Sequence, residues 1–267
     1  MWQYFCEEDR ILVNKFKKNI RLLTKLEVKS PNVIKGIQFE GLRVVGRPDA
    51  MAEAYYNQNI DEIMYVDVVA SLYERRQIIE TVAEASKKIF IPMTVGGGIR
   101  SIEDIQKALE SGADKVTINT AAVANPNIID QGSLKYGSQC ILVSIEAKNR
   151  GGWWEVLTDN GRQSTGVSVV DWVKEVQDRG AGEILLTSID KDGTRKGFDL
   201  NLYKSVSADI GVPLIACGGL GSLEHIQDLL EVARIDAICC GAALHFNVLS
   251  VSEIKQFIQS LGYWVRL

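Results

Sequence analysis

The stretch Thr94-Val-Gly-Gly-Gly-Ile-Arg-Ser-Ile-Glu, residues 94–103, runs from an apolar strand-like segment through three glycines into a segment with helical spacing. A second stretch, Ala216-Cys-Gly-Gly-Leu-Gly-Ser-Leu-Glu at residues 216–224, repeats this order of features. Three pairs of identical residues are separated by nearly the same distance in the sequence, about 120 residues. These pairs are Gly96 and Gly218, Ala121 and Ala242, and Asp67 and Asp190. Three matches at nearly one offset predict a duplicated half-structure.

Outward from these stretches, short apolar runs alternate with amphipathic segments along the chain. The predicted strands are Arg21–Val28, Ile63–Val68, Ile91–Val95, Lys115–Asn119, Cys140–Ile145, Glu183–Ser188, Pro213–Cys217 and Ala237–Cys240. Eight such units predict an α/β fold, a (β/α)8 TIM barrel with two-fold repeated half-barrels. We expect one barrel domain over residues 17–267. Residues 1–16 form an N-terminal extension that could be a helix, a barrel plug or the product of a mis-chosen start codon.

Composition narrows the class of protein. The formal net charge of -4 offers no basic excess for binding nucleic acid. No apolar run reaches the roughly 18 residues that cross a bilayer, and the N-terminus lacks a signal-peptide pattern. Five cysteines without framework spacing suit a reducing compartment, so we expect a cytoplasmic protein without nucleic-acid or membrane partners.

Two glycine-rich turns follow predicted strands at the end of a barrel where active sites lie. Glycines let the backbone approach a ligand, and each turn leads into a helix whose N-terminus favours an anion. The residues predicted to bind phosphate are Gly97, Gly98, Asn119 and Thr120 in one half, and Gly218, Gly219, Gly241 and Ala242 in the other. The alternative is that these glycines only make tight turns. Two cradles across one barrel mouth suggest a substrate with a phosphate at each end.

Glu27 and Glu146 end strands that the repeat places opposite each other. Two carboxylates facing each other across a pocket suit general acid–base catalysis, although both could be solvated loop carboxylates. His225 and His245 have no partner at metal-ligand spacing, so no metal site is predicted and surface or packing roles are favoured.

Longer motifs add a family resemblance. The chain carries Gly112-Ala-Asp-Lys-Val-Thr-Ile-Asn-Thr-Ala-Ala, Tyr136-Gly-Ser-Gln and Arg179-Gly-Ala-Gly-Glu-Ile-Leu-Leu-Thr-Ser-Ile-Asp-Lys-Asp-Gly-Thr. From about Arg21 to Leu267 it resembles the histidine-biosynthesis barrel family, and within it the cyclase subunits of imidazole glycerol phosphate synthase.

The resemblance implies that a separate glutaminase subunit docks on the N-terminal face of the barrel. Its ammonia then travels up the barrel core to a bis-phosphorylated ribulosyl aminoimidazole substrate, and no cofactor is needed. The implied ammonia gate consists of Arg21, Glu62, Lys115 and Glu183. The resemblance also adds Lys35, Asp192 and Gly193 to the substrate contacts.

Departures from the family pattern leave three functions open. The two catalytic positions are aspartates in the family but are Glu27 and Glu146 here, and a shift of about one ångström can cost on the order of a hundredfold in rate. The chain could be a working cyclase with a glutamate pair. It could instead be a paralogue that passes ammonia to an amidotransferase making an acetamidino group on a bacterial surface sugar. A non-catalytic activator of the glutaminase is the third reading.

Overall fold

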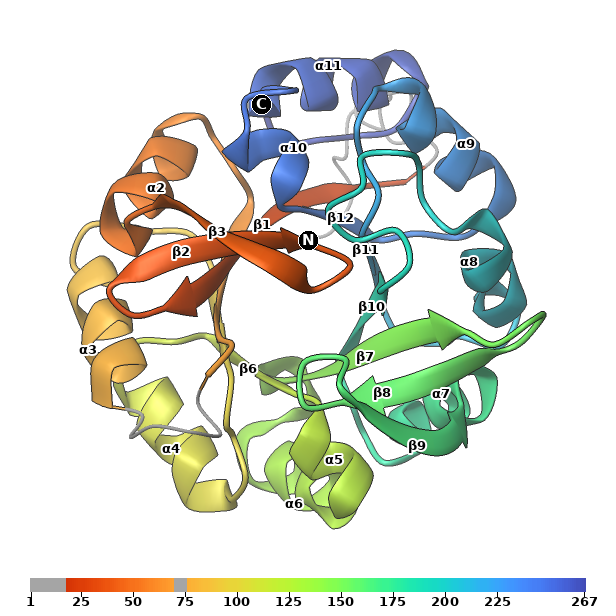
Figure 1. The fold of residues 1–267 in the computed structure, drawn as a ribbon. Coiled ribbons are helices and arrows are strands. Elements are labelled where there is room, and N and C mark those ends of the chain that lie inside the picture. Colours follow the sequence, from red (N-terminus) through yellow and green to blue (C-terminus); the bar gives the residue numbers. More distant parts are fainter. Residues whose placement is uncertain (1–17, 70–75) are drawn as a thin grey trace, which may run out of the picture.

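The computed structural model describes residues 18–69 and 76–267, so the extension predicted over residues 1–16 lies outside the described residues. Eight parallel strands form a closed barrel (Figure 1). In their order around the barrel they are β1 (Arg21–Lys29), β4 (Glu62–Asp67), β5 (Met93–Gly96), β6 (Lys115–Ile118), β7 (Ile141–Asn149), β10 (Glu183–Ser188), β11 (Leu214–Cys217) and β12 (Ala237–Cys240). β12 pairs back on β1 and closes the ring. The predicted barrel and its eight strands are confirmed.

Helices surround the barrel on its outer side (Figure 1). They are α2 (Pro48–Asn57), α3 (Arg76–Ala85), α4 (Ile102–Glu110), α5 (Thr120–Ala124), α6 (Asn127–Tyr136), the 3-10 turn η1 (Ser138–Cys140), α7 (Val169–Asp178), α8 (Leu200–Ser207), α9 (Glu224–Val232), α10 (Ala242–His245) and α11 (Val251–Ser260). A capping box between Ser101 and Asp104 begins α4. None of the described helices is long and apolar enough to cross a membrane.

The strands are buried on both faces, which explains their nearly continuous apolar character. One hydrophobic cluster fills the barrel interior and a larger one lies between the strands and the helices. The interior cluster consists of Leu23, Met64, Leu142, Leu185, Ile215, Cys217, Ala237 and Cys239. The barrel is therefore a packed core between its N-terminal floor and its C-terminal mouth.

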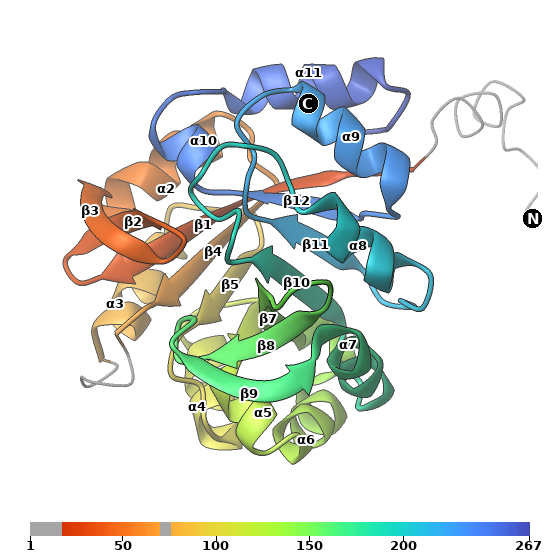
Figure 2. The same ribbon diagram turned by 45° about the vertical axis from the view of Figure 1, so that its right-hand side comes forward.

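Two antiparallel hairpins, which the sequence analysis did not predict, rise at the mouth (Figures 1 and 2). The first, β2 (Asn32–Ile37) and β3 (Glu40–Gly46), continues from β1. The second, β8 (Trp154–Thr158) and β9 (Gln163–Ser168), continues from β7. β1 and β7 are the opposite strands of the ring, so each half-barrel carries a hairpin at the equivalent place.

The turns of the two hairpins meet. A Cβ atom placed on Gly161, in the β8–β9 turn, would lie 2.8 Å from a ring carbon of Phe39, in the β2–β3 turn. Such a distance is shorter than real Cβ contacts, so the two turns are in van der Waals contact across the mouth. The two hairpins therefore cover the ends of β1 and β7 from both sides of the mouth.

Candidate active site

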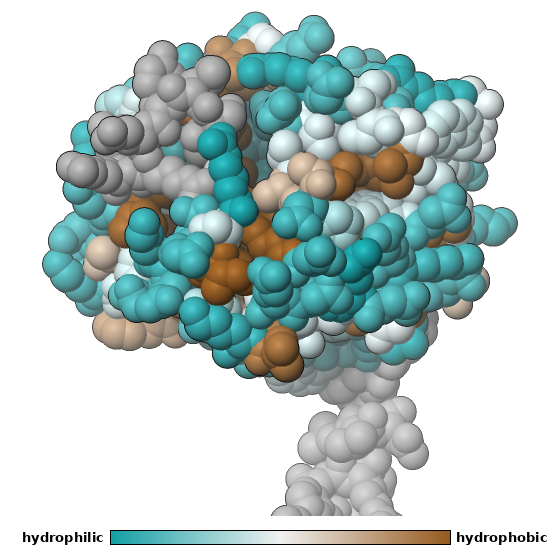
Figure 3. Space-filling view, turned by 90° about the horizontal axis from the view of Figure 1, so that it is seen from below, coloured by the Kyte–Doolittle hydropathy of each residue, from teal (hydrophilic) through white to brown (hydrophobic). Residues whose placement is uncertain are grey.

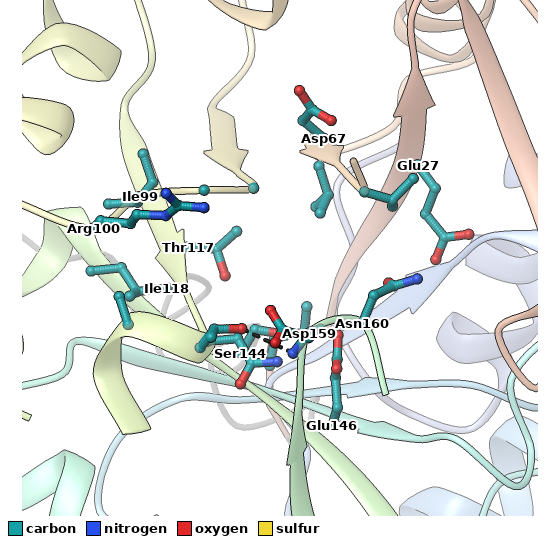
Figure 4. Close-up of a pocket in the computed structure, with 18 of the residues that line it drawn as sticks. Glu27, Asp67, Ile99, Arg100, Thr117, Ile118, Ser144, Glu146, Asp159 and Asn160 are labelled. Carbon is teal, nitrogen blue, oxygen red and sulfur yellow. Dashed lines mark hydrogen bonds between the residues drawn. The ribbon is translucent and has the colours of Figure 1, made fainter. Parts of the chain in front are cut away.

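A cavity of about 390 Å³ opens at the mouth of the barrel (Figure 4). The site residues predicted from the sequence that line it are Glu27, Gly97, Gly98, Asn119, Thr120 and Glu146. In the view of Figure 4, Glu27 and Glu146 reach the cavity with Asn160 between them. The structure thus brings the predicted glutamate pair and the first predicted phosphate cradle into one space, which we call the first cavity.

A second, much smaller cavity of about 10 Å³ lies beside β11 and β12. The predicted site residues that line it are Lys35, Asp192, Gly193, Gly218, Gly219, Gly241 and Ala242. The predicted substrate contacts are therefore divided between two cavities, one for each half-barrel. Their role in binding phosphate remains a prediction.

Two of the cradle positions require glycine on geometric grounds alone. Gly97 has φ +92°, and a Cβ there would lie 2.2 Å from the carbonyl oxygen of Asp67. Gly219 has φ +109°, and a Cβ there would lie 2.1 Å from the carbonyl oxygen of Gly197. Tight turn packing accounts for both glycines, and the same bare backbone is what a phosphate would need for close approach.

The two cradles also share a backbone geometry at the starts of the short helices α5 and α10. Asn119 precedes α5 with φ -123° and ψ -87°, and Gly241 precedes α10 with φ -121° and ψ -91°. In the first cavity, Asn119 Oδ1 and Thr117 Oγ1 are buried without a hydrogen-bond partner among the described residues. Because buried polar atoms are normally paired, these two oxygens mark the first cavity as the better prepared to receive a hydrogen-bonding ligand.

Glu27 is held by two lysines. Lys25 Nζ lies 2.8 Å from Glu27 Oε1, and Lys35 Nζ donates to both carboxylate oxygens at 3.1 and 3.0 Å. Lys35 also donates to Asp192 at 2.7 Å. We call Lys25, Glu27, Lys35 and Asp192 the mouth quartet. Burial opposes ionisation of Glu27, but the fields of Lys25 and Lys35 outweigh it and lower the pKa of Glu27 to about 2.

Glu146 has a different environment. Its Oε2 accepts one backbone hydrogen bond, from Gly161 N–H at 2.8 Å, and no ion pair to it occurs among the described residues. Lys148, two residues further along β7, pairs with Asp190 instead. Burial raises the pKa of Glu146 to about 7, although Lys25 and the Gly161 N–H oppose this rise. Near neutral pH the two glutamates therefore differ in protonation, which is an arrangement suited to acid–base chemistry.

The four residues predicted to form the gate meet at the floor of the barrel. Each is the first residue of its strand, and together they close a ring of ion pairs that we call the floor ring. Arg21 bonds Glu62 at 3.0 Å and Glu183 at 2.6 Å, and Lys115 bonds the same two glutamates at 3.0 and 2.8 Å. Two cations and two carboxylates balance one another, which makes their burial at the end of an apolar core tolerable.

The two histidines do not join the site chemistry. His245 is half-buried between Tyr55, whose hydroxyl lies 2.8 Å from Nδ1, and the backbone carbonyl of Lys25, 3.1 Å from Nε2. Burial lowers the pKa of His245 to about 4, so it stays neutral and braces β1 from outside. His225 Nδ1 accepts the N–H groups of Gly221 and Ser222 before α9. Groups of three or more metal-ligating side chains do not occur within the described ranges.

Lys25 is a site residue that the sequence analysis missed. It lines both cavities and contributes a buried cation, with 9% of its side chain exposed. A signal was available, because Arg21, Leu23, Lys25 and Glu27 alternate along β1 and so share the interior face. A lysine on the inward face of an otherwise apolar strand is costly unless it is paired, and this cost points to a specific role.

Comparison with known proteins agrees with this site. The profile of the family described as histidine biosynthesis protein matches residues 21–250. A relative from Legionella pneumophila, named imidazole glycerol phosphate synthase subunit HisF, is 56% identical over 210 residues. That alignment covers 78% of this chain and 99% of the relative. The profile match and the 56% identity to this relative show that the chain belongs to the histidine biosynthesis protein family.

Proposed function

We propose that this chain is the cyclase subunit of imidazole glycerol phosphate synthase, an ammonia-using lyase of histidine biosynthesis. Its substrate would be the bis-phosphorylated ribulosyl aminoimidazole compound, and its product imidazole glycerol phosphate. The observation that carries the proposal is a pair of glutamates at the barrel mouth, placed in different electrostatic surroundings beside two glycine-built cradles. The 56% identical relative named as such a subunit supports it.

The two cavities suit the two ends of this substrate. One phosphate would bind at Gly97, Gly98 and Thr120, and the other at Gly219 and Gly241. The reacting part of the molecule would then lie beside Glu27 and Glu146, between the two anchored ends. Anchoring both ends fixes the reacting atoms, and such positioning can supply a large share of a rate enhancement.

Ammonia would reach this place through the barrel. Above the floor ring, the interior is lined by side chains such as Leu23, Leu142 and Ile215. An apolar core favours neutral ammonia over the ammonium ion, because a bare charge is expensive to bury. The floor ring would open to admit ammonia by parting one of its ion pairs.

A glutaminase subunit would dock on the N-terminal face, around the floor ring. Exposed hydrophobic side chains lie on this face before β5 and in the C-terminal segment after α11, including Phe90 with 76% exposed, Trp264 and Leu267. The side of the barrel in Figure 3 is by contrast mostly hydrophilic, with hydrophobic residues in small separate groups. Exposed apolar side chains on this face suit a protein partner.

We place the protein in the cytoplasm and treat residues 17–267 as one domain preceded by the extension of residues 1–16. The free cysteines Cys217, Cys239 and Cys240 lie in strands of the barrel, which suits a reducing compartment.

The test is turnover of the ribulosyl aminoimidazole substrate by the purified chain, with ammonium salts replacing the glutaminase. We expect turnover, and we expect Glu27→Gln and Glu146→Gln each to lower kcat by about 10²- to 10⁴-fold, because each removes a proton-transferring group. Glu110→Gln, an equal loss of charge on the exposed end of α4, is the matched control. Absence of turnover, with binding of the substrate intact in calorimetry, would contradict the proposal and redirect the search to another ammonia acceptor.

A further inference from the structure

Lys25 occupies the point where the two cavities adjoin. Its side chain extends from the interior face of β1, two residues along the strand from Leu23, which belongs to the apolar layer of the barrel interior. It is the residue of β1 that lines both cavities, whereas Glu27 lines the first. A group in this place adjoins both ends of a bound substrate and the carboxylate that would act on it.

The contacts of Lys25 are specific. Its ammonium group lies 2.8 Å from Glu27 Oε1 and 5.6 Å from the centre of the Phe39 ring. Lys35 bonds both oxygens of Glu27 and also Asp192, so the mouth quartet contains two cations and two carboxylates. The quartet is internally neutral, and Lys35 alone would have to serve two buried carboxylates if Lys25 were absent.

Glu146 lies outside this balance. Its partners are the Gly161 N–H and the side chain of Asn119, and the nearby Lys148 is engaged by Asp190. The two glutamates therefore have the same side chain but opposite surroundings, one between two ammonium groups and one without a paired cation. A buried carboxyl group without a cation favours its protonated form.

We propose that Lys25 is a positioning residue that holds the Glu27 carboxylate ionised at the junction of the two cavities, so that Glu27 acts as the base and Glu146 as the acid. The assignment of acid and base rests on the proposed function. The hold of Lys25 on Glu27 does not, because it follows from the contacts alone.

The protonation states agree with this geometry. Burial disfavours the ammonium form of Lys25, but Glu27 and the other acidic groups nearby outweigh it and raise the pKa of Lys25. Lys25 thus remains a cation, and it is unsuited to act as a nucleophilic amine. The titratable groups around Glu27, from every element packed against it, are Lys25 on β1, Lys35 on β2, Asp67 on β4, Glu146 on β7, Asp192 after β10, Cys217 on β11, Cys239 on β12 and His245 on α10.

A direct test follows the Glu27 carboxyl group by carbon-13 NMR in the full chain with labelled glutamate, the Glu27 signal being identified by its loss in Glu27→Gln. In the native chain we expect this signal to remain that of a carboxylate from pH 8 to the lowest pH at which the chain stays folded, because the pKa of Glu27 is about 2. In Lys25→Met we expect the pKa of Glu27 to rise by at least about one unit, which is a tenfold change in its acid equilibrium. Lys25→Arg restores a cation and should return the pKa of Glu27 toward its native value.

Lys148→Met is the matched control, because it removes a cation from the same rim without touching Glu27. It should leave the Glu27 titration unchanged. Lys25→Gln, which keeps a polar group in the barrel, provides the same measurement if the methionine variant does not fold. An unchanged Glu27 titration in a folded Lys25 variant without the cation would overturn the inference.

A kinetic measurement separates this inference from the proposed function. With rates referred to the concentration of unprotonated ammonia, the acidic limb of the pH–rate profile of Lys25→Met should move to higher pH by as much as the Glu27 pKa rises in the NMR titration, and that of Lys25→Arg should not. Absence of turnover in every variant would reject the proposed function while the NMR titration still decides the role of Lys25. Turnover with an unchanged acidic limb in Lys25→Met would reject the inference while the proposed function stands.

Discussion

The floor and the mouth of the barrel each hold two cations and two carboxylates, yet the two groups of charges are constructed differently. The floor ring takes one residue from the start of each of four strands, and each cation bonds both carboxylates. The mouth quartet takes Lys25 and Glu27 from β1, Lys35 from the adjoining hairpin and Asp192 from the loop after β10.

The two groups differ in whether each ion pair is duplicated and in how far their side chains are exposed to solvent. In the floor ring, loss of one cation leaves both glutamates bonded to the other, and Arg21 has 26% of its side chain exposed. In the mouth quartet, Lys35 is the cation that bonds Asp192, and 2% of its side chain is exposed. An ion pair that is buried and not duplicated should be the more costly to break.

The largest effect on stability is therefore expected for Lys35→Met. This change leaves Asp192 buried without its cation, and breaking a buried pair on one side costs about 3–5 kcal/mol. Chemical denaturation of the full chain measures the loss, with Lys35→Arg as the variant that keeps the charge. A loss below about 1 kcal/mol would show that the mouth quartet is as hydrated as a surface pair.

An intermediate effect is expected for Glu146, the mouth carboxyl outside the quartet. Its pKa is raised from an ordinary value near 4.5 to about 7, so its contribution to stability is complete below about pH 4.5 and is lost as the pH rises through 7. Between pH 5.5 and 8.5 the native chain should lose about 2 kcal/mol that Glu146→Gln retains.

Thermal unfolding of both chains at the two pH values checks this prediction. Glu155→Gln is a control, because hydrogen bonds, chiefly from Gly166 N–H, lower the pKa of Glu155 and place its titration below this range. Equal pH dependence in the native chain and Glu146→Gln would mean that Glu146 is already ionised at pH 5.5.

The smallest effect is expected for Arg21→Met at the floor. Lys115 still bonds both Glu62 and Glu183, and water reaches this end of the barrel, so we expect a loss of about 1 kcal/mol. The same denaturation experiment measures it beside Lys35→Met. A larger loss at the floor than at the mouth would reverse the comparison between the two groups.

The sequence by itself determined the architecture. Alternation of apolar runs with amphipathic segments depends on local burial, and all eight predicted strands are present. The glycine turns were readable because a positive φ and a close backbone contact are requirements of a single position, as at Gly97 and Gly219. The residues of the floor ring were found through the family resemblance, and the structure brings them together.

Only the tertiary structure decided how the charges at the mouth are shared. Lys25 and Glu27 are two residues apart on β1. Lys35 reaches them from the hairpin that follows β1, and Asp192 reaches Lys35 from the loop after β10, far away in the sequence. The hairpins themselves escaped prediction because at least half of the residues of β3 and of β9 are exposed and show little apolar alternation. Two glutamates at equivalent places in a repeat have the same intrinsic acidity. Their different pKa values arise from burial and neighbouring cations, which exist once the chain has folded.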